Sequence, residues 1–369
     1  MTESIHPGRY LVTSLSGLTL SAEEKVYLKA VKPAGVMLFS RNIRDLEQVT
    51  HLIERIRHYS ADTVLWIDQE GGRVQRLGHP LTPLPAAEQF AKLYRHAPMQ
   101  ARYLAEQAGA LAGRELKSLG FGVNCAPVLD IPAPQADPVI GNRAFGRDAH
   151  TITDLAGAWL TGLQSAGVMG VAKHFPGHGD ALVDSHLALP RVKTEIGELR
   201  QKTWVPYVQL IKQIQGIMTA HLVMENLDPQ HPATWSSVVL KDWLRGRLGY
   251  TGLIVSDALE MGALGGSMED RAARAIRAGC DQLLVCSGRR NHMEQALCGV
   301  VQALGEKSQS EQQSDGQRME RILSSCRFSP GNWQKVVEDP AQEALKESLQ
   351  RLVSHDLGRD PTEVLHRKL

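Results

Sequence analysis

The sequence predicts an α/β protein in which eight short strands, each followed by a helix, close into a parallel (β/α)8 barrel. Two observations support this prediction. Short apolar runs alternate with segments of helical apolar spacing, and no two neighbouring runs lie close enough in sequence to form a hairpin. The eight runs span residues 10–15, 35–39, 64–67, 122–126, 168–172, 216–220, 252–255 and 282–286.

The segments between these runs have the caps and the spacing of helices. Ser21 can cap the first one, and the apolar residues of 46–56 recur at helical intervals. Gly120 ends a long helical segment, and residues 199–214 are expected to be helical despite Pro206. The long segment that Gly120 ends covers residues 99–119, and the remaining helical segments cover 155–166, 236–244 and 268–278.

The alternative architecture is a doubly wound open sheet. No G-x-G-x-x-G or G-x-x-x-x-G-K turn follows a strand to mark a nucleotide site, which favours the barrel. We therefore expect a (β/α)8 barrel over residues 1–306 and a polar linker with a C-terminal helical appendage over 307–369. Within the appendage, two helical segments are expected near 318–326 and 341–353, and a charged tail over 358–369.

Charge and composition exclude several classes of protein. The chain has 41 basic and 40 acidic residues, so no overall field favours nucleic acid or an anionic membrane. Its five cysteines are odd in number and lack C-x-x-C spacing, which disfavours a disulfide framework and a structural zinc site. The N-terminus lacks signal-peptide features, and no apolar run is long enough to span a membrane. We expect a soluble, cytoplasmic monomer.

The stretch 173–186, KHFPGHGDALVDSH, contains three histidines, two aspartates and one lysine. Pro176 and Gly177 interrupt it, so the sequence predicts a loop here. Asp184 lies two positions before His186, a spacing that places both side chains on one side of an extended backbone. Such a carboxylate can set the tautomer of the imidazole and stabilise its charged form.

Titratable residues directly follow several of the predicted strands. They are Asp68, Lys173, His174, His221 and Asp257. In a parallel barrel all strands end at one face, where active sites are built, so these side chains are expected to converge. A single aspartate after a strand is more often a helix cap, but five such residues at one rim favour a site.

Two arginines are further candidates for substrate binding. Arg76 closes the segment DQEGGRVQRL that begins at Asp68, and its guanidinium could hold a polar substrate or pair with Glu70. Arg143 lies in the glycine-rich segment GNRAFGRD, on the long loop after the fourth strand.

These segments, in their order and spacing, resemble glycoside hydrolase family 3, and specifically its single-domain bacterial β-N-acetylglucosaminidases. The matching pieces are DQEGGRVQRL at 68–77, PVLDI at 127–131, IGNRAFG at 140–146, KHFPGHG and DSH within 173–186, TAH at 219–221 and SDALEM at 256–261. Together they extend through most of residues 8–305. KHFPGHG followed by DSH is the most specific of them.

The resemblance implies a retaining mechanism with Asp257 as nucleophile and His186, paired with Asp184, as acid/base. Many relatives have a second aspartate after the nucleophile, where this chain has Ala258. The residues expected to hold N-acetylglucosamine are Asp68, Arg76, Arg143, Lys173 and His174, and the possible further site residues are His178, His221 and Asp130.

The implied substrate class is small muropeptides, in particular N-acetylglucosamine linked to 1,6-anhydro-N-acetylmuramic acid, hydrolysed in the cytoplasm during peptidoglycan recycling. The implied chemistry requires no cofactor and no metal. A rival interpretation is a metal-dependent barrel hydrolase with His174, His178, His221 and Asp257 as ligands. A third is a sugar-binding protein without catalysis, which the presence of both Asp257 and His186 disfavours.

Overall fold

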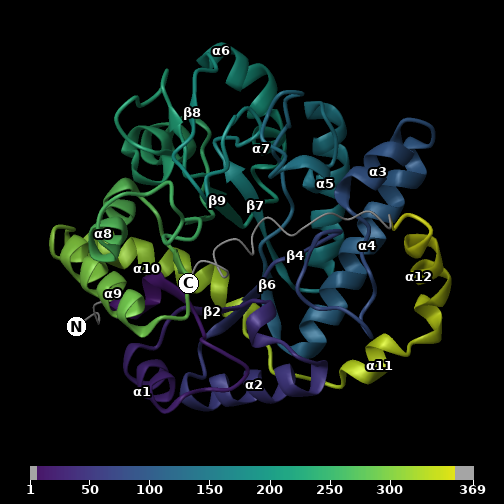
Figure 1. The fold of residues 1–369 in the computed structure, drawn as a ribbon, viewed down its shortest axis with the longest axis horizontal. Helices are drawn as coiled ribbons and strands as arrows, with labels where there is room; N and C mark the ends of the chain where they lie inside the picture. The colour runs from purple at the N-terminus through teal and green to yellow at the C-terminus, as the bar shows by residue number, and fades with distance from the viewer. Residues whose placement is uncertain (1–5, 354–369) are drawn as a thin grey trace.

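The eight predicted strands form one parallel sheet in the computed structural model, which describes residues 6–353 (Figure 1). They are β1 Leu11–Ser14, β2 Gly35–Leu38, β3 Val64–Ile67, β6 Phe121–Asn124, β7 Met169–Phe175, β9 Gly216–Thr219, β11 Leu253–Val255 and β12 Leu283–Val285. The sheet runs in the order β11-β9-β7-β6-β3-β2-β1-β12. A parallel bridge between Val255 and Gln282 joins its two ends, so the predicted (β/α)8 barrel is confirmed.

The strands are visible in the sequence because helices cover the outside of the barrel and side chains fill its inside. Every residue of β1, β2, β3 and β6 is buried, so both faces of each strand are covered and most of their residues are apolar. Two expectations about strands were wrong. Lys173 and His174 lie inside β7, before the loop begins, and a short antiparallel hairpin joins β4 Gln69–Gly71 to β5 Val74–Gln75.

The helices around the barrel in Figure 1 are α1 Ala22–Val31, α2 Leu46–Tyr59, α4 Pro98–Leu119, α5 Ala149–Ser165, α7 Val205–Leu210, α8 Met268–Ala278 and α9 Arg290–Gly305. A helix of π type, Val238–Arg247, occupies the position between β9 and β11. Ser21 caps α1 as predicted, with Glu24 completing a capping box, and Gly120 ends α4 at a φ of 95°.

The segment predicted to be helical over 199–214 is helical as far as Leu210, but in separate pieces. The structure has a short helix α6 Ile196–Glu198, a π-helical turn Leu199–Thr203, and then α7. Pro206 sits in the first turn of α7, the one place where a helix tolerates a residue without an N–H. Helix α3, Ala87–Tyr94, was not predicted.

The segment expected to be a polar linker is helical. Helix α10, Gln309–Leu323, starts at its cap Ser308 and buries Met319 and Leu323 in the same core as the barrel. Two further helices, α11 Trp333–Val337 and α12 Glu343–Gln350, continue along the outside of α4 (Figure 1). The division at residue 306 stays a prediction, and the tail expected over 358–369 lies outside the described residues.

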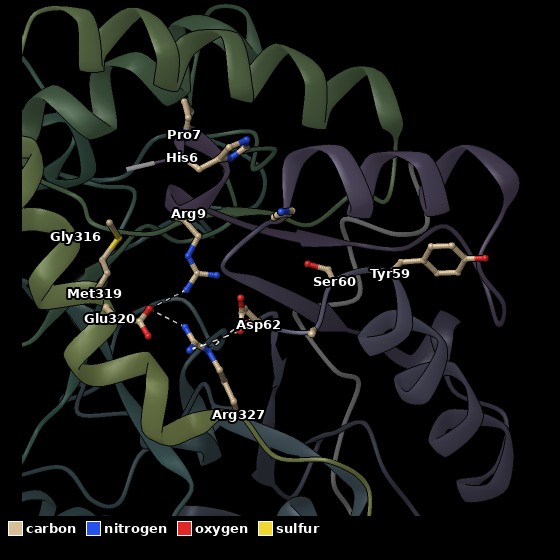
Figure 2. Close-up of a pocket in the computed structure, with 12 residues that line it drawn as sticks. His6, Pro7, Arg9, Tyr59, Ser60, Asp62, Gly316, Met319, Glu320 and Arg327 are labelled. Carbon is tan, nitrogen blue, oxygen red and sulfur yellow. Dashed lines mark hydrogen bonds and ion pairs between the residues drawn. The ribbon is translucent and has the colours of Figure 1, made fainter. Parts of the chain in front are cut away.

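A large hollow of about 1910 Å³ lies at the amino ends of the strands, between the start of β1, the α2–β3 turn and α10 (Figure 2). Arg9 and Arg327 both point toward Glu320 there, at 3.5 Å and 2.7 Å. These ion pairs connect α10 to the base of the barrel, at the end opposite the one where the site is predicted. Among residues 6–353, no helix is long and apolar enough to cross a membrane.

Candidate active site

A pocket with an empty volume of about 470 Å³ opens at the carboxyl ends of the strands. Six of the residues that the sequence singled out line it, namely Asp68, Arg143, Lys173, His174, His186 and Asp257. The rest of its wall consists of Met37, Phe39, Met218, Ala258, Leu284 and Cys286. Charged groups therefore meet in a largely apolar enclosure, where electrostatic interactions are stronger than in water.

Asp257 reaches this pocket from the turn that follows β11. Its Oδ1 accepts a hydrogen bond from the Ala258 N–H at 2.7 Å. Burial acts to raise the pKa of Asp257, but nearby imidazoles and this N–H outweigh it and hold the pKa below its ordinary value. The imidazoles belong to His221, His174 and His186. Asp257 is consequently an ionised carboxylate at neutral pH.

His186 and Asp184 form the pair that their spacing predicted. Asp184 Oδ1 lies 2.7 Å from His186 Nδ1 and also accepts the His186 backbone N–H at 2.8 Å. Burial acts to raise the pKa of Asp184, but the hydrogen bonds to His186 bring it below its ordinary value. An ionised carboxylate only accepts, so Nδ1 carries the hydrogen and Nε2 is the nitrogen that can exchange a proton.

Beside the two predicted catalytic groups lies a buried network of charges. Lys173 Nζ bonds Asp68 at 3.0 Å and Glu70 at 2.7 Å, and Arg143 holds Glu70 with two hydrogen bonds of 2.8 Å. Arg76 donates to the second oxygen of Asp68 at 3.0 Å. Arg76 does not line the pocket, so its place in the structure is that of a group that positions Asp68.

The network keeps its members charged despite burial. Burial acts to raise the pKa of Asp68 and Glu70, but Lys173 and the arginines hold both below their ordinary values. Burial acts to lower the pKa of Lys173, and the same two carboxylates raise it instead. The carboxylates are two and the cations three, counting Arg76 and Arg143, so the network faces the pocket with an excess of positive charge.

Glu70 is the principal residue that sequence reasoning missed. It was considered only as a partner for Arg76, whereas the structure pairs it with Arg143 and Lys173. Its position two residues after Asp68 could have revealed it. In an extended strand, side chains two residues apart point to the same face, so Glu70 lies on the same side as Asp68. Glu70 falls in β4, the hairpin strand that the sequence did not reveal.

Asp130, named only as a possible site residue, is fully buried behind the pocket wall. Its Oδ2 lies 2.7 Å from His174 Nδ1, and its Oδ1 accepts the His178 N–H at 2.7 Å. Burial acts to raise the pKa of Asp130, and His174 with the surrounding hydrogen bonds lowers it. Asp130 therefore orients the ring of His174, which does line the pocket.

His178 and His221 lie behind the pocket wall, and each has its own partners. His178 Nε2 is 2.9 Å from Ser185 Oγ, and burial lowers the pKa of His178 to about 4. His221 Nδ1 is 2.7 Å from Thr234 Oγ1 and its Nε2 is 3.0 Å from the Ala258 carbonyl. Burial likewise lowers the pKa of His221. Both imidazoles are structural supports of neighbouring loops.

This distribution does not favour the metal-dependent alternative. Within residues 6–353, no three His, Cys, Asp or Glu side chains are grouped so that they could hold a metal ion. The rings of the proposed ligands His174, His178 and His221 already bond to Asp130, Ser185 and Thr234, respectively.

A parallel barrel whose pocket holds an ionised carboxylate, a carboxylate-supported imidazole and a rim of polar donors has groups that suit sugar hydrolysis. The comparison with known families agrees. The profile described as "Glycosyl hydrolase family 3 N terminal domain" matches residues 11–324. The chain belongs to this family, and it is a glycoside hydrolase.

Individual relatives are similar over most of their length. A protein named "Beta-hexosaminidase" from Thioalkalivibrio sulfidiphilus is 41% identical over 301 residues, which are 80% of this chain and 84% of the relative. One of the same name from Idiomarina loihiensis is 36% identical over 318 residues, with 85% and 92% covered.

Solved structures of family 3 enzymes are also similar to this chain. A family 3 β-N-acetylglucosaminidase from Paenibacillus sp. is 30% identical with a TM-score of 0.84, covering 95% of this chain and 68% of that one. NagZ from Neisseria gonorrhoeae, in complex with N-trifluoroacetyl-D-glucosamine, is 30% identical with a TM-score of 0.81 and coverages of 94% and 98%.

Proposed function

We propose that this protein is a retaining β-N-acetylglucosaminidase that removes terminal β-linked N-acetylglucosamine. The observation that supports the proposal most strongly is that Asp257 and His186 line one small pocket, with Asp184 bonded to His186 at 2.7 Å. The names of the relatives point in the same direction. In this proposal Asp257 is the nucleophile and the His186–Asp184 pair is the acid/base.

In the first step, an oxygen of Asp257 attacks the anomeric carbon of the bound sugar. At the same time, protonated His186 gives its Nε2 proton to the glycosidic oxygen, so the aglycone leaves as an alcohol and a covalent glycosyl ester remains on Asp257. Asp184 stabilises the imidazolium before the transfer. The Ala258 N–H, at 2.7 Å, holds one carboxylate oxygen and leaves the other for the attack.

In the second step, neutral His186 takes a proton from a water molecule that attacks the same carbon. The bond to Asp257 breaks, and the sugar leaves with its original β configuration. An imidazole suits both steps because its ordinary pKa of about 6.5 makes both protonation states available near pH 7. The low pKa of Asp257 keeps the free carboxylate ionised until it attacks, as a nucleophile requires.

The charged network is the proposed binding site for the sugar hydroxyls and the acetamide group. Asp68, Arg143, Lys173 and His174 line the pocket and offer both donors and acceptors. Arg76 and Glu70 lie behind them and fix their positions through ion pairs of 3.0 Å and 2.8 Å. Hydrogen bonds from charged groups in an enclosed site are stronger than those between neutral groups, so this network supplies binding and orientation.

The proposed natural substrates are small muropeptides, with N-acetylglucosamine joined to 1,6-anhydro-N-acetylmuramic acid as the central case. The proposal places the protein in the cytoplasm, as a monomer acting in peptidoglycan recycling.

The test is hydrolysis of this disaccharide and of 4-nitrophenyl β-N-acetylglucosaminide, followed by proton NMR during the first minutes. The β anomer should form first, and addition of a chelator should leave both rates unchanged. Initial formation of the α anomer would refute retention. Loss of activity with the chelator, restored by a divalent metal, would favour the metal-dependent alternative, and binding without hydrolysis would favour a sugar-binding protein.

A further inference from the structure

Among the described residues, the segment 182–189, which carries His186, is hydrogen-bonded to the rest of the molecule at two separate points. At the first, Ser185 Oγ lies 2.9 Å from His178 Nε2. Both side chains are buried, at 3% and 4% exposure, between two regions of the pocket rim. Ser185 stands between Asp184 and His186, so this one contact places the whole acid/base pair.

The partner of Ser185 is itself rigidly held. The His178 N–H donates to Asp130 Oδ1 at 2.7 Å, and the other oxygen of Asp130 holds the ring of His174. Asp130 is completely buried. The chain of contacts therefore runs from the barrel through Asp130 and His178 to Ser185, and from there to the acid/base.

At the second point, the backbone of the segment packs against the loop that follows Asp257. The Gly262 N–H donates to the His186 carbonyl at 3.1 Å, and the Ala263 N–H donates to the Ser185 carbonyl at 3.2 Å. A Cβ at position 262 would lie 2.8 Å from the His186 oxygen and 3.0 Å from the Leu187 oxygen. This approach is possible only with glycine.

The remainder of the segment makes little apolar contact. Leu182, Val183, Leu187 and Leu189 are 66%, 43%, 55% and 37% exposed. A loop that buries so little apolar surface opens at low cost in free energy unless specific contacts hold it. The two attachment points are such contacts, and they come from the loops that follow β7 and β11.

We propose that His178, Ser185 and Gly262 are positioning residues that form a two-point clamp for the acid/base. The His178–Ser185 hydrogen bond ties His186 to the sugar-binding side of the pocket, and the close approach at Gly262 ties it to the nucleophile loop. The clamp sets the distance between the imidazole and the bond to be cleaved. This inference rests on the proposed roles of His186 and Asp257.

The test compares kcat/KM for the disaccharide with kcat/KM for the nitrophenyl glycoside in Ser185→Ala and Gly262→Ala. The disaccharide has a poor leaving group and needs a well-placed acid, whereas nitrophenolate leaves with little help. A displaced His186 should therefore lower kcat/KM about fivefold to tenfold more for the disaccharide, the range expected for one ordinary hydrogen bond. KM for the nitrophenyl glycoside should fall as glycosyl-enzyme accumulates.

The chain offers a matched control for each variant. Ser165→Ala removes a serine hydroxyl hydrogen bond, from Ser165 Oγ to the Gly162 carbonyl at 2.7 Å, at the end of α5 and outside the loop that carries His186. Gly265→Ala adds a methyl group in the same loop as Gly262, at a position where no atom lies within 4 Å. Both controls should keep the wild-type ratio between the two substrates.

A rescue variant separates positioning from mere loss of stability. His178→Gln places an amide nitrogen near the position of the imidazole Nε2 and can still donate to Ser185 Oγ, so it should retain more disaccharide activity than His178→Ala. Because His186 remains the acid/base, Ser185→Ala should keep the shape of the pH–rate profile and lower only its height. Thermal melts confirm that each variant is folded.

His186→Ala, measured alongside, distinguishes the two ways in which the experiment can fail. If His186→Ala loses disaccharide activity selectively while Ser185→Ala and Gly262→Ala match their controls, the clamp is refuted and the proposed function stands. If His186→Ala affects both substrates equally, the acid/base assignment itself is refuted, and the clamp with it.

Discussion

Asp257 is the residue on which the proposed covalent chemistry depends most directly. Its carboxylate lines the pocket and is kept ionised by its surroundings, yet within residues 6–353 it accepts a single hydrogen bond, from the neighbouring Ala258 N–H. Few other groups in the protein need Asp257 as a hydrogen-bond partner. Substitution at this position should accordingly affect catalysis far more than stability.

We expect Asp257→Ala to fold like the wild type and to lose hydrolysis by roughly four orders of magnitude or more, because no covalent intermediate can form. The measurement is turnover of the nitrophenyl glycoside beside a thermal melt. Azide can enter the space left by the carboxylate, and its attack from that side would give an α-glycosyl azide. Activity within tenfold of wild type would remove Asp257 from the mechanism.

His186 serves in both proposed steps, and the steps can be separated by the choice of substrate. In His186→Ala, kcat/KM should fall by about two orders of magnitude or more for the disaccharide and much less for the nitrophenyl glycoside. Glycosyl-enzyme should accumulate with the activated substrate, because no base activates the water. Intact-mass spectrometry of quenched reactions detects it as added mass on the protein.

Asp184→Asn should give a milder form of the same defect. The amide can keep a contact at the 2.7 Å position of the carboxylate but loses the charge that supports the imidazolium. An equal loss on both substrates in His186→Ala, with no trapped sugar, would move the acid/base role elsewhere. His178 and His221 are weaker candidates, since both lie behind the pocket wall and their pKa values are lowered.

At the scale of elements, the turn after β7 links stability to pH through His178. Burial lowers the pKa of His178 to about 4 from an ordinary 6.5, so the folded protein keeps this imidazole neutral. Between pH 4 and 6.5 the unfolded chain binds a proton here that the folded chain does not. The free energy of unfolding should therefore rise with pH across this window and level off above it.

The expected contribution of His178 is of the order of 3 kcal/mol across the full window. Urea unfolding of the wild type and of His178→Gln at intervals from pH 4 to pH 7.5 measures it. The slope with pH should be visibly smaller in the variant, while His221 leaves some slope of the same sign in both. Identical slopes would show that His178 does not titrate differently in the folded and unfolded states.

At the scale of the whole molecule, α10 completes the base of the barrel. It buries Met319, Ile322 and Leu323 in the main core, and Arg318 on the same helix pairs with the buried carboxylate of Asp281. Gly122 in β6 approaches the backbone of the turn after α10 so closely that a Cβ would lie 1.8 Å from the Cys326 oxygen. These contacts make α10 part of the barrel core.

A chain ending at residue 307 should consequently be unfolded or insoluble, since burial of three large side chains contributes roughly 5 kcal/mol or more. A chain ending at residue 331 keeps α10 and the hydrogen bond from Gly331 to Ser118, and should stay folded and active. Its main loss is the buried Leu349 of α12. Soluble, active protein from the shorter chain would show that α10 is dispensable.

The sequence by itself determined the architecture and the two catalytic candidates. Barrel strands bury both faces, so they are apolar runs that can be counted, and polar residues such as Asp257 at their ends must gather at one rim. The Asp184–His186 pair was equally readable, because a spacing of two residues already sets its geometry. Lys173 and His174 were predicted at the correct end of β7. They were expected just after the strand, whereas β7 continues to Phe175 and includes both.

Only the tertiary structure decided which of these groups hold one another. Glu70 joins Arg143 and Lys173, Asp130 orients His174, and the acid/base segment rests against Gly262, all through contacts between residues distant in sequence. Position 262 needs glycine because the carbonyl oxygens of His186 and Leu187 would lie 2.8 Å and 3.0 Å from a Cβ there, an approach that no local pattern encodes. Strands follow from local apolar runs, which the sequence shows directly. Contacts between side chains distant in sequence depend on how strand ends and loops meet in space, so the sequence did not reveal them.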